Sequence, residues 1–184
     1  MDLIRHYRLM ARNNAWSNYR LLKAACQLTE DQFAATRTSF FPSLRETLNH
    51  ILLVDLYYLD AIEDGGRGRA YFERWSPHPE ARALSHEQQA TDRHLIAFCD
   101  LLTMEDLSRV IRIERKNGVD GETIGDTLAH LFVHQIHHRG QAHAMMSGTP
   151  VPPPQLDEYF LAYDADARAA DLKAMGIEGP EDIR

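Results

Sequence analysis

The sequence predicts an all-α protein, an up-down four-helix bundle with a long crossover loop and a short extra C-terminal helix. Two long segments with helical spacing of apolar residues, each opened by a capping signal, carry this prediction. The 184 residues are enough for one buried core, and 44% hydrophobic residues is ordinary for a globular protein. The one strand-like stretch is too short to form a sheet domain.

The first half of the chain predicts two of the four helices. Apolar residues near a helical period predict an amphipathic helix over residues 2–28. The stretch 26–41 has turn-forming residues and no clean period, so we expect a surface connector. The S-x-x-E capping box of Ser43 and Glu46 opens a second helix, which ends at Gly65. Because this helix is apolar over much of its girth, we expect it at the centre of the bundle.

The long crossover is predicted between the second and third helices. Residues 65–85 are rich in Gly, Arg, Pro and aromatic residues, which is typical of a long loop with at most one short helical turn. Ser85 and Gln88 form a second capping-box pattern, which predicts that the third helix begins at Ser85 and ends near Leu102.

The fourth helix is predicted after a short extended segment. β-branched residues and some alternation over 108–123, with a turn at 118–121, indicate a strand pair or an extended link. Thr123 and Asp126 then form a capping signal, and the helical pattern continues to Gly148.

The C-terminal part predicts an extended crossing followed by a short helix. Three consecutive prolines favour extended backbone over 151–160, and a helix closed by Gly176 follows. We expect the last eight residues to be frayed. The predicted division is a bundle over residues 1–164 and a C-terminal helical extension and tail over residues 165–184.

Composition excludes several classes of function. The formal net charge of −7 and the scattered basic residues argue against nucleic-acid binding. The N-terminus lacks the apolar core of a signal peptide, and no apolar run reaches membrane-spanning length. Cys26 and Cys99 form neither a disulfide framework nor a CxxC motif, so we expect two quiet core thiols. These features predict a cytoplasmic protein.

Five of the ten histidines lie within the fourth predicted helix. His134 and His138 are one turn apart and about 40° apart around the helix axis, as two ligands of one metal ion must be. They fall on the arc that the apolar pattern turns inward. His130 also stands one turn before His134, so spacing alone leaves open which pair binds. His137 projects further round, and we expect it at the surface or behind the ligands.

A third histidine lies in the other strongly apolar helix. His50 stands between Leu48 and Ile51, where exposure to solvent is not expected. It is either a hydrogen-bonded core histidine or a third ligand from a facing helix. Three neutral imidazoles around one point suit a divalent transition metal, Zn, Ni or Fe, and leave at least one position open for water or substrate.

Three segments resemble the DinB family of DNA-damage-inducible four-helix-bundle proteins. They are "ARNNAWSNYRLL", "LNHILLVDLYYL" and "LAHLFVHQIHHRGQAHAMM" with the following "GTPVPPPQLD", and the "HxxHHRGQ" run is the family's signature. The resemblance implies a bundle with a long crossover and a divalent metal on three histidines, which here would be His50, His134 and His138. It places His130 outside the ligand set. It also implies a homodimer.

The resemblance implies a class of activity as well. Relatives include S-transferases that use a low-molecular-weight thiol such as bacillithiol or mycothiol, so we expect a metal-dependent thiol transferase acting on a small-molecule electrophile. A metal-stabilised bundle without catalysis and a metal-dependent hydrolase remain the alternatives.

Four further residues near the expected site receive individual expectations. Gln141 would fix a ligand ring or a metal-bound water, and Tyr57 would line the pocket. Arg139 would serve packing or an ion pair, and Gly140 would permit close helix approach. The sequence assigns no catalytic or cofactor-binding residue.

Overall fold

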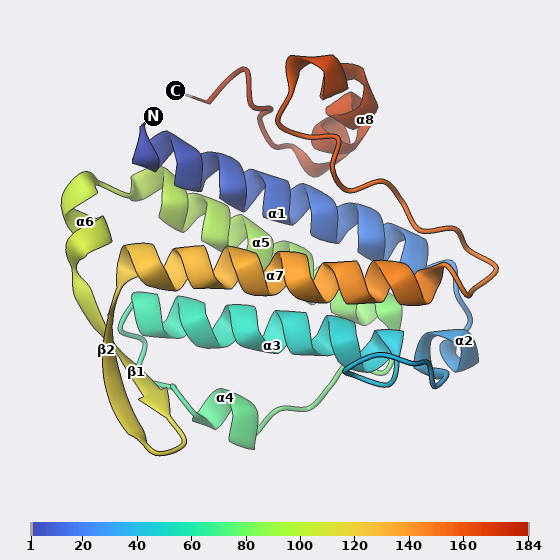
Figure 1. Ribbon diagram of the computed structural model, residues 1–184, viewed down its shortest axis with the longest axis horizontal. Coiled ribbons are helices and arrows are strands. Elements are labelled where there is room, and N and C mark those ends of the chain that lie inside the picture. The colour runs from blue at the N-terminus through green and yellow to red at the C-terminus, as the bar shows by residue number, and fades with distance from the viewer. Residues whose placement is uncertain (1, 184) are drawn as a thin grey trace.

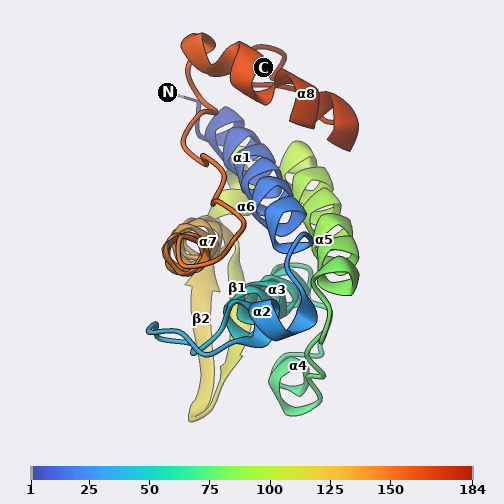
Figure 2. The same cartoon turned by 90° about the vertical axis from the view of Figure 1, so that its right-hand side faces the viewer.

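The computed structural model describes residues 2–183 and is mostly helical, with one small two-stranded sheet (Figure 1). The four long helices are α1 (Leu3–Ala25), α3 (Leu44–Ile62), α5 (Ala81–Leu101) and α7 (Ile124–Met146). Figures 1 and 2 show α1 packed beside α5 and α3 beside α7, which together form a four-helix bundle. The predicted helical fold is confirmed.

The chain runs through the bundle in the order up, down, down, up. Asp55 contacts Gln88 and Glu63 contacts His94, so α3 and α5 run in the same direction. The crossover between them holds the short helix α4 (Ala70–Glu73), in agreement with the predicted loop and its helical turn. The α3 and α7 helices are antiparallel neighbours, and this pairing brings their histidines together.

Capping explains where several helices begin. Ser43 Oγ accepts a hydrogen bond from the Glu46 N–H and starts α3 as predicted. Two short helices were not predicted, α2 (Glu30–Ala34) within the expected connector and α6 (Met104–Ser108) after α5. Each opens with a reciprocal capping box, at Thr29 and Thr103 respectively.

The predicted start of the third helix is wrong. The α5 helix begins at Ala81, one turn before Ser85, although its N-cap residue supplies no side-chain hydrogen bond. The reason is burial, because Ala81 and Leu84 are 9% and 1% exposed and pack in an apolar cluster with Leu48 and Leu52 of α3. Gln88 is buried and donates to Asp55 instead of closing a capping box.

The predicted strand pair is a β-hairpin of β1 (Val110–Arg115) and β2 (Gly118–Thr123). Its turn lies at residues 116–117, not at 118–121, because Arg115 already pairs with Gly118. Gly118 has a φ of 153°, which only glycine adopts readily at the start of the returning strand.

The C-terminal part packs against the bundle. It comprises the 3-10 turn η1 (Ala162–Asp164), helix α8 (Ala165–Met175) and residues 176–183. The expectation of a frayed tail is wrong, because Arg5 donates to the carbonyl oxygens of Pro180 and Ile183. The proposed division at residue 164 remains a prediction.

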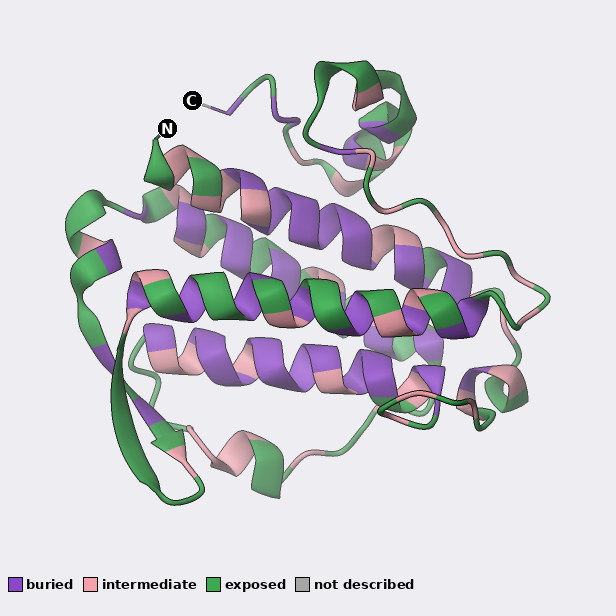
Figure 3. Ribbon diagram, in the orientation of Figure 1, coloured by how far each residue is buried: buried purple, intermediate pink, exposed green. Residues whose placement is uncertain are grey.

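The core has two large apolar clusters with a polar layer between them, and a smaller cluster of Trp16, Tyr159 and Leu172. One cluster contains Ala15, Val54 and Leu95, and the other contains Leu21 and Leu52. Figure 3 shows buried residues along all four long helices and exposed residues along the outer side of α7. None of the described helices combines the length and the hydropathy needed to cross a membrane.

Candidate metal centre

The three predicted ligands lie together between α3 and α7. His50 comes from α3, and His134 and His138 come from successive turns of α7. One ligand atom from each of these side chains lies within 4.8 Å of the other two, and this is the one such group found among residues 2–183. His130, the alternative partner of His134, is outside the group.

The spacing of the ring nitrogens fits a shared ion. His50 Nε2 and His134 Nε2 are 3.0 Å apart. Two imidazole ligands of a tetrahedral zinc, with Zn–N bonds of about 2.05 Å, place their nitrogens about 3.3 Å apart. Two helices that deliver imidazole nitrogens to this distance form a donor set suited to a borderline-soft divalent ion.

Gln141 orients the third ring. His138 Nδ1 donates to Gln141 Oε1 at 2.8 Å, which leaves His138 Nε2 with a free lone pair. The Gln141 side-chain amide also contacts the exposed His137 ring, with Nε2 atoms 3.0 Å apart. Gln141 therefore holds a candidate ligand ring, as expected, and His137 lies behind the ligands at the surface.

Burial keeps the triad in the form that binds metal. Desolvation and the neighbouring His138 lower the pKa of His50 to about 4. Desolvation and the surrounding histidines lower the pKa of His134 to about 3. Burial also lowers the pKa of His138, against the opposing effect of its bond to Gln141. Because only neutral imidazole carries a free lone pair, these shifts favour ligation at neutral pH.

Two phenylalanines of the loop before α3 cover one side of the triad. The Phe41 ring lies 4.4 Å from that of His50 and 5.6 Å from that of His138, measured between centroids. Phe40 packs edge-on against Phe41 and is 78% exposed. No local sequence pattern predicted this cover, because it depends on how the 36–42 loop folds back toward His138 of α7.

A cavity of about 340 Å³ opens beside the other side of the triad. His50 and His134 line one part of it, and Tyr57 lines another, as expected. His130 also lines this cavity, so the structure gives it a place beside the ligands and not among them. A ligand in the cavity would therefore contact the side chains of His50 and His134.

A buried polar layer lies behind the triad and joins all four long helices. Arg139 is buried and donates to Asn18 Oδ1 at 3.0 Å and to Gln135 Oε1 at 3.2 Å. Asp92 accepts from Asn18, and Gln88 donates to both Asp92 and Asp55. The sequence predicted packing or an ion pair for Arg139, and the structure gives this buried residue hydrogen bonds to amide side chains.

Burial controls the titration of this layer. Desolvation, reinforced by Asp92, raises the pKa of Asp55 to about 8. Desolvation raises the pKa of Asp92 to about 6 and lowers that of Arg139 to about 10. Apolar periodicity did not reveal this layer, because charged residues within a helical pattern are ordinarily assigned to the exposed face.

The expectation for Gly140 is wrong. A Cβ atom added at Gly140 would meet nothing within 4 Å, so this glycine permits no close helix approach. It lies on the exposed outer side of α7. Cys99, in contrast, is a buried free thiol whose pKa is raised to about 12 by desolvation, in agreement with a quiet core role.

The fold and the site together define a helical bundle with a candidate three-histidine metal centre between two antiparallel helices. Residues 4–171 match the sequence model of the DinB family, which covers most of the chain. The chain belongs to the DinB family.

Two similar proteins come from Bacillus subtilis. Protein DinB of strain 168 is 23% identical over 140 residues, an alignment that covers 72% of this chain and 80% of that protein. The crystal structure of a DinB-like protein, YjoA, matches with a TM-score of 0.55 and 21% identity, and covers 82% of this chain and 96% of that one. At this identity the structural match supports the fold alone.

Proposed function

We propose that the protein binds a divalent transition metal ion, Zn, Ni or Fe, and is a metal-dependent enzyme of the thiol S-transferase type acting on small electrophiles. The observation that carries this proposal is a compact histidine triad bordered by a cavity of about 340 Å³. A site that only stabilises a fold needs no such cavity, whereas an enzyme must admit a ligand beside the ion.

In this proposal each residue of the site has a distinct task. His50, His134 and His138 hold the ion through their Nε2 atoms, and Gln141 keeps the His138 ring in the required tautomer. The bound ion would supply the charge that lowers the pKa of a low-molecular-weight thiol. The sulfur then forms a bond to the electrophilic carbon, the leaving group departs with its electron pair, and the thiol proton goes to solvent.

Phe41 and Val54 contribute a drier environment. Phe41 contacts the His50 ring, and Val54 lines the cavity next to the triad. Excluding water at this point favours neutral imidazoles and strengthens the electrostatic effect of a bound ion.

Elemental analysis tests the metal part of the proposal. Tag-free protein purified without added metal should carry near-stoichiometric Zn, Ni or Fe, and both His50→Ala and His134→Ala should lose it. His86→Ala, which removes an exposed histidine from α5, should retain it. Wild-type protein that stays metal-free after titration with divalent ions would remove the basis for catalysis.

Two competing functions share the triad and separate in further measurements. In a non-catalytic bundle the ion would staple α3 to α7, so chelation should lower the melting temperature strongly while no thiol binds. In a hydrolase the loaded protein should cleave an activated ester without any thiol. A transferase should show a spectral change when a thiol is added to the Co(II)-substituted protein, and this change should be absent from His50→Ala.

A homodimer and a cytoplasmic location are part of the same proposal. Val133 and Ile136 are 66% and 53% exposed on the outer side of α7, which supports association through this helix. Both cysteines are free thiols, as expected in a reducing compartment. Analytical ultracentrifugation of wild type and Ile136→Glu tests the dimer.

A further inference from the structure

The cavity beside the triad is positively charged, although the protein as a whole is acidic. Arg69, Arg115 and Lys116 line it, together with one acidic residue, Glu114. Arg69 also lies 3.6 Å from Glu73, an exposed partner one turn along α4. The chain carries a formal net charge of −7, so three cations around one cavity are an unusual local concentration. Such a cavity attracts anions and raises their local concentration.

The acidic residue is already engaged in holding the wall together. Glu114 Oε2 accepts a hydrogen bond from the backbone N–H of Arg69 at 3.1 Å. A Cβ atom at Gly68, whose φ is 43°, would lie 2.3 Å from the same oxygen, so the loop requires glycine there. The Glu114 carboxylate therefore serves to fasten the crossover loop to the β-hairpin.

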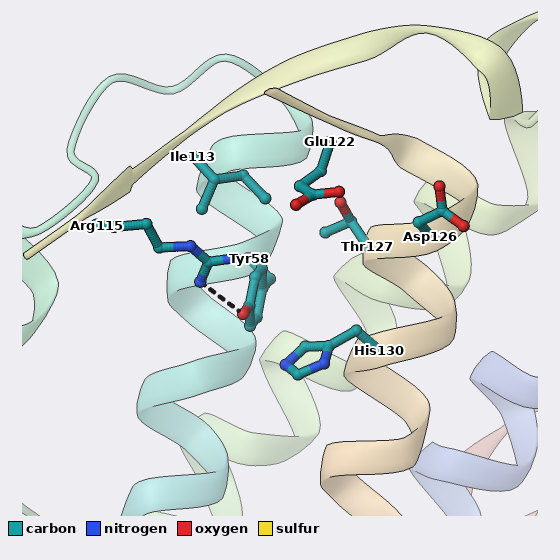
Figure 4. A pocket seen from close by; sticks show the side chains of 7 residues that line it. All are labelled: Tyr58, Ile113, Arg115, Glu122, Asp126, Thr127 and His130. Atoms are coloured by element: carbon teal, nitrogen blue, oxygen red, sulfur yellow. Dashed lines mark hydrogen bonds between the residues drawn. The ribbon is translucent and has the colours of Figure 1, made fainter. Parts of the chain in front are cut away.

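The hairpin is fixed to α3 by two adjacent tyrosines. Tyr57 donates its hydroxyl hydrogen to the Glu114 carbonyl oxygen. The Arg115 guanidinium donates to Tyr58 Oη at 3.0 Å and lies 5.8 Å from the centroid of that ring (Figure 4). Arg115 Nε also lies 3.7 Å from Asp120 Oδ2, a carboxylate on the returning strand that is 63% exposed. The Arg115 side chain stays 39% exposed, and the guanidinium has five N–H donors, so donors remain for a ligand.

Lys116 is unengaged. Its side chain makes no hydrogen bond or ion pair within residues 2–183, and it follows Arg115 directly at the hairpin turn. Val54 and Phe72 also line the cavity and add apolar surface to it. The cavity therefore combines an apolar surface, a pair of adjacent cations and two histidines of the triad.

A neighbouring cavity of about 250 Å³ has the opposite character. It shares Tyr58, Arg115 and His130 with the first, but Glu122 and Asp126 line its other part (Figure 4). These two carboxylates disfavour an anion there. The excess of positive charge therefore lies at the cavity that includes His50 and His134, and not at its neighbour.

We propose that this cavity takes a small organic anion, an apolar molecule with a carboxylate or phosphate group bound at Arg115 and Lys116 and its remainder directed toward the triad. Arginine suits either oxyanion, because its planar N–H groups match two oxygens at once. The volume of about 340 Å³ limits the ligand to a compact molecule. The part of the inference that directs the ligand toward a metal rests on the proposed function, whereas the oxyanion site does not.

Three matched probes test the inference: benzoate, phenyl phosphate and benzamide, titrated into the full chain and followed by two-dimensional NMR. We expect at least one anion to bind about tenfold more tightly than neutral benzamide, with shifts at the hairpin and a preference that weakens as salt is added. A preference for benzoate identifies a carboxylate ligand, and a preference for phenyl phosphate identifies a phosphate ester.

Three variants locate the preference. Arg115→Gln and Lys116→Gln should each reduce the anion preference several-fold, and Arg112→Gln, which removes a cation from the same strand outside this cavity, should leave it unchanged. Since Lys116 makes no internal contact, its variant tests the site even if Arg115→Gln disturbs the hairpin. Equal affinity for all three probes, or an anion preference that survives in Lys116→Gln and Arg115→Gln, would overturn the inference.

The same titrations, repeated after chelation, separate this inference from the proposed function. An anion preference that persists in chelated protein, alongside wild type that binds no metal, would refute the metalloenzyme and retain the oxyanion site. Stoichiometric metal on His50 and its partners without any anion preference would refute the oxyanion site alone.

Discussion

His138 Nδ1 donates a hydrogen bond to Gln141 Oε1 at 2.8 Å, across one turn of α7. This contact selects the tautomer in which His138 Nε2 is free to bind a metal. Among the three candidate ligands, His134 has a buried Nδ1 atom that makes no hydrogen bond within residues 2–183. Side-chain support of ring orientation is therefore most evident at His138.

Replacing Gln141 should weaken metal binding without abolishing it. Gln141→Leu removes the acceptor for the His138 N–H, and losing such a partner typically costs about 10- to 100-fold in metal affinity. Competition with a chromophoric chelator measures this change. Gln27→Leu, at an exposed glutamine after α1, is the matched control and should bind metal as wild type does. An unchanged affinity in Gln141→Leu would show that packing alone orients the His138 ring.

Metal should be retained to a lower pH than ordinary histidines allow. Protons displace metal only when they bind the ligand nitrogens, and an unperturbed imidazole is protonated below about pH 6.5. Burial lowers the pKa of His50 to about 4 and of His134 to about 3, so these two nitrogens remain available well below 6.5. Elemental analysis after dialysis at stepped pH should show retention at pH 5.5 and release near pH 4. Half-release near pH 6.5 would contradict the burial of the triad.

Removing Phe41 should shift this release upward. Phe41→Ala uncovers the His50 ring, which it contacts at 4.4 Å, and hydration of the imidazole returns its pKa toward the ordinary value. We expect the release midpoint to rise by about one pH unit. Phe40→Ala removes an equally large ring that is 78% exposed, and should change the midpoint much less. Equal shifts in both variants would argue against a specific role for Phe41.

Arg139 should contribute to stability through the buried polar layer, independently of metal. Arg139→Met removes the cation that faces the ionised Asp92 and the buried hydrogen bonds to Asn18 and Gln135, and breaking a buried charge arrangement in this way costs about 3 to 5 kcal/mol. Urea unfolding of chelated protein measures the change. Arg112→Met, at an exposed position of β1, should alter the free energy of unfolding by about 0.5 kcal/mol or less. A similarly small effect of Arg139→Met would show that the positive charge of Arg139 does not stabilise the buried layer.

The parts of the structure that depend on local pattern were predictable. The Ser43 cap and the run of apolar residues after it placed α3, and the Thr123 cap placed α7. The spacing of His134 and His138 predicted that they share an inward arc, and the family resemblance selected them over His130. The structure confirms that these two and His50 meet, because α3 and α7 pack side by side.

The parts that depend on tertiary contacts were not predictable. The start of α5 at Ala81 follows from burial of its first turn, although the more conspicuous capping pattern lies at Ser85. Phe41 reaches the triad by a loop that folds back, and Arg115 reaches the cavity from a hairpin 65 positions after His50 in the sequence. Such contacts between distant segments leave no local periodicity.

The buried polar layer also has a consequence for assembly of the bundle. Apolar side chains tolerate sliding of one helix along another, but Asp55, Asp92 and Arg139 find their partners in a single axial alignment, and a shift of one turn would leave them buried without hydrogen bonds. In that alignment His50 stands opposite His134. The buried polar layer thus sets the axial register of α3 against α7, and this register brings the imidazoles of the two helices together.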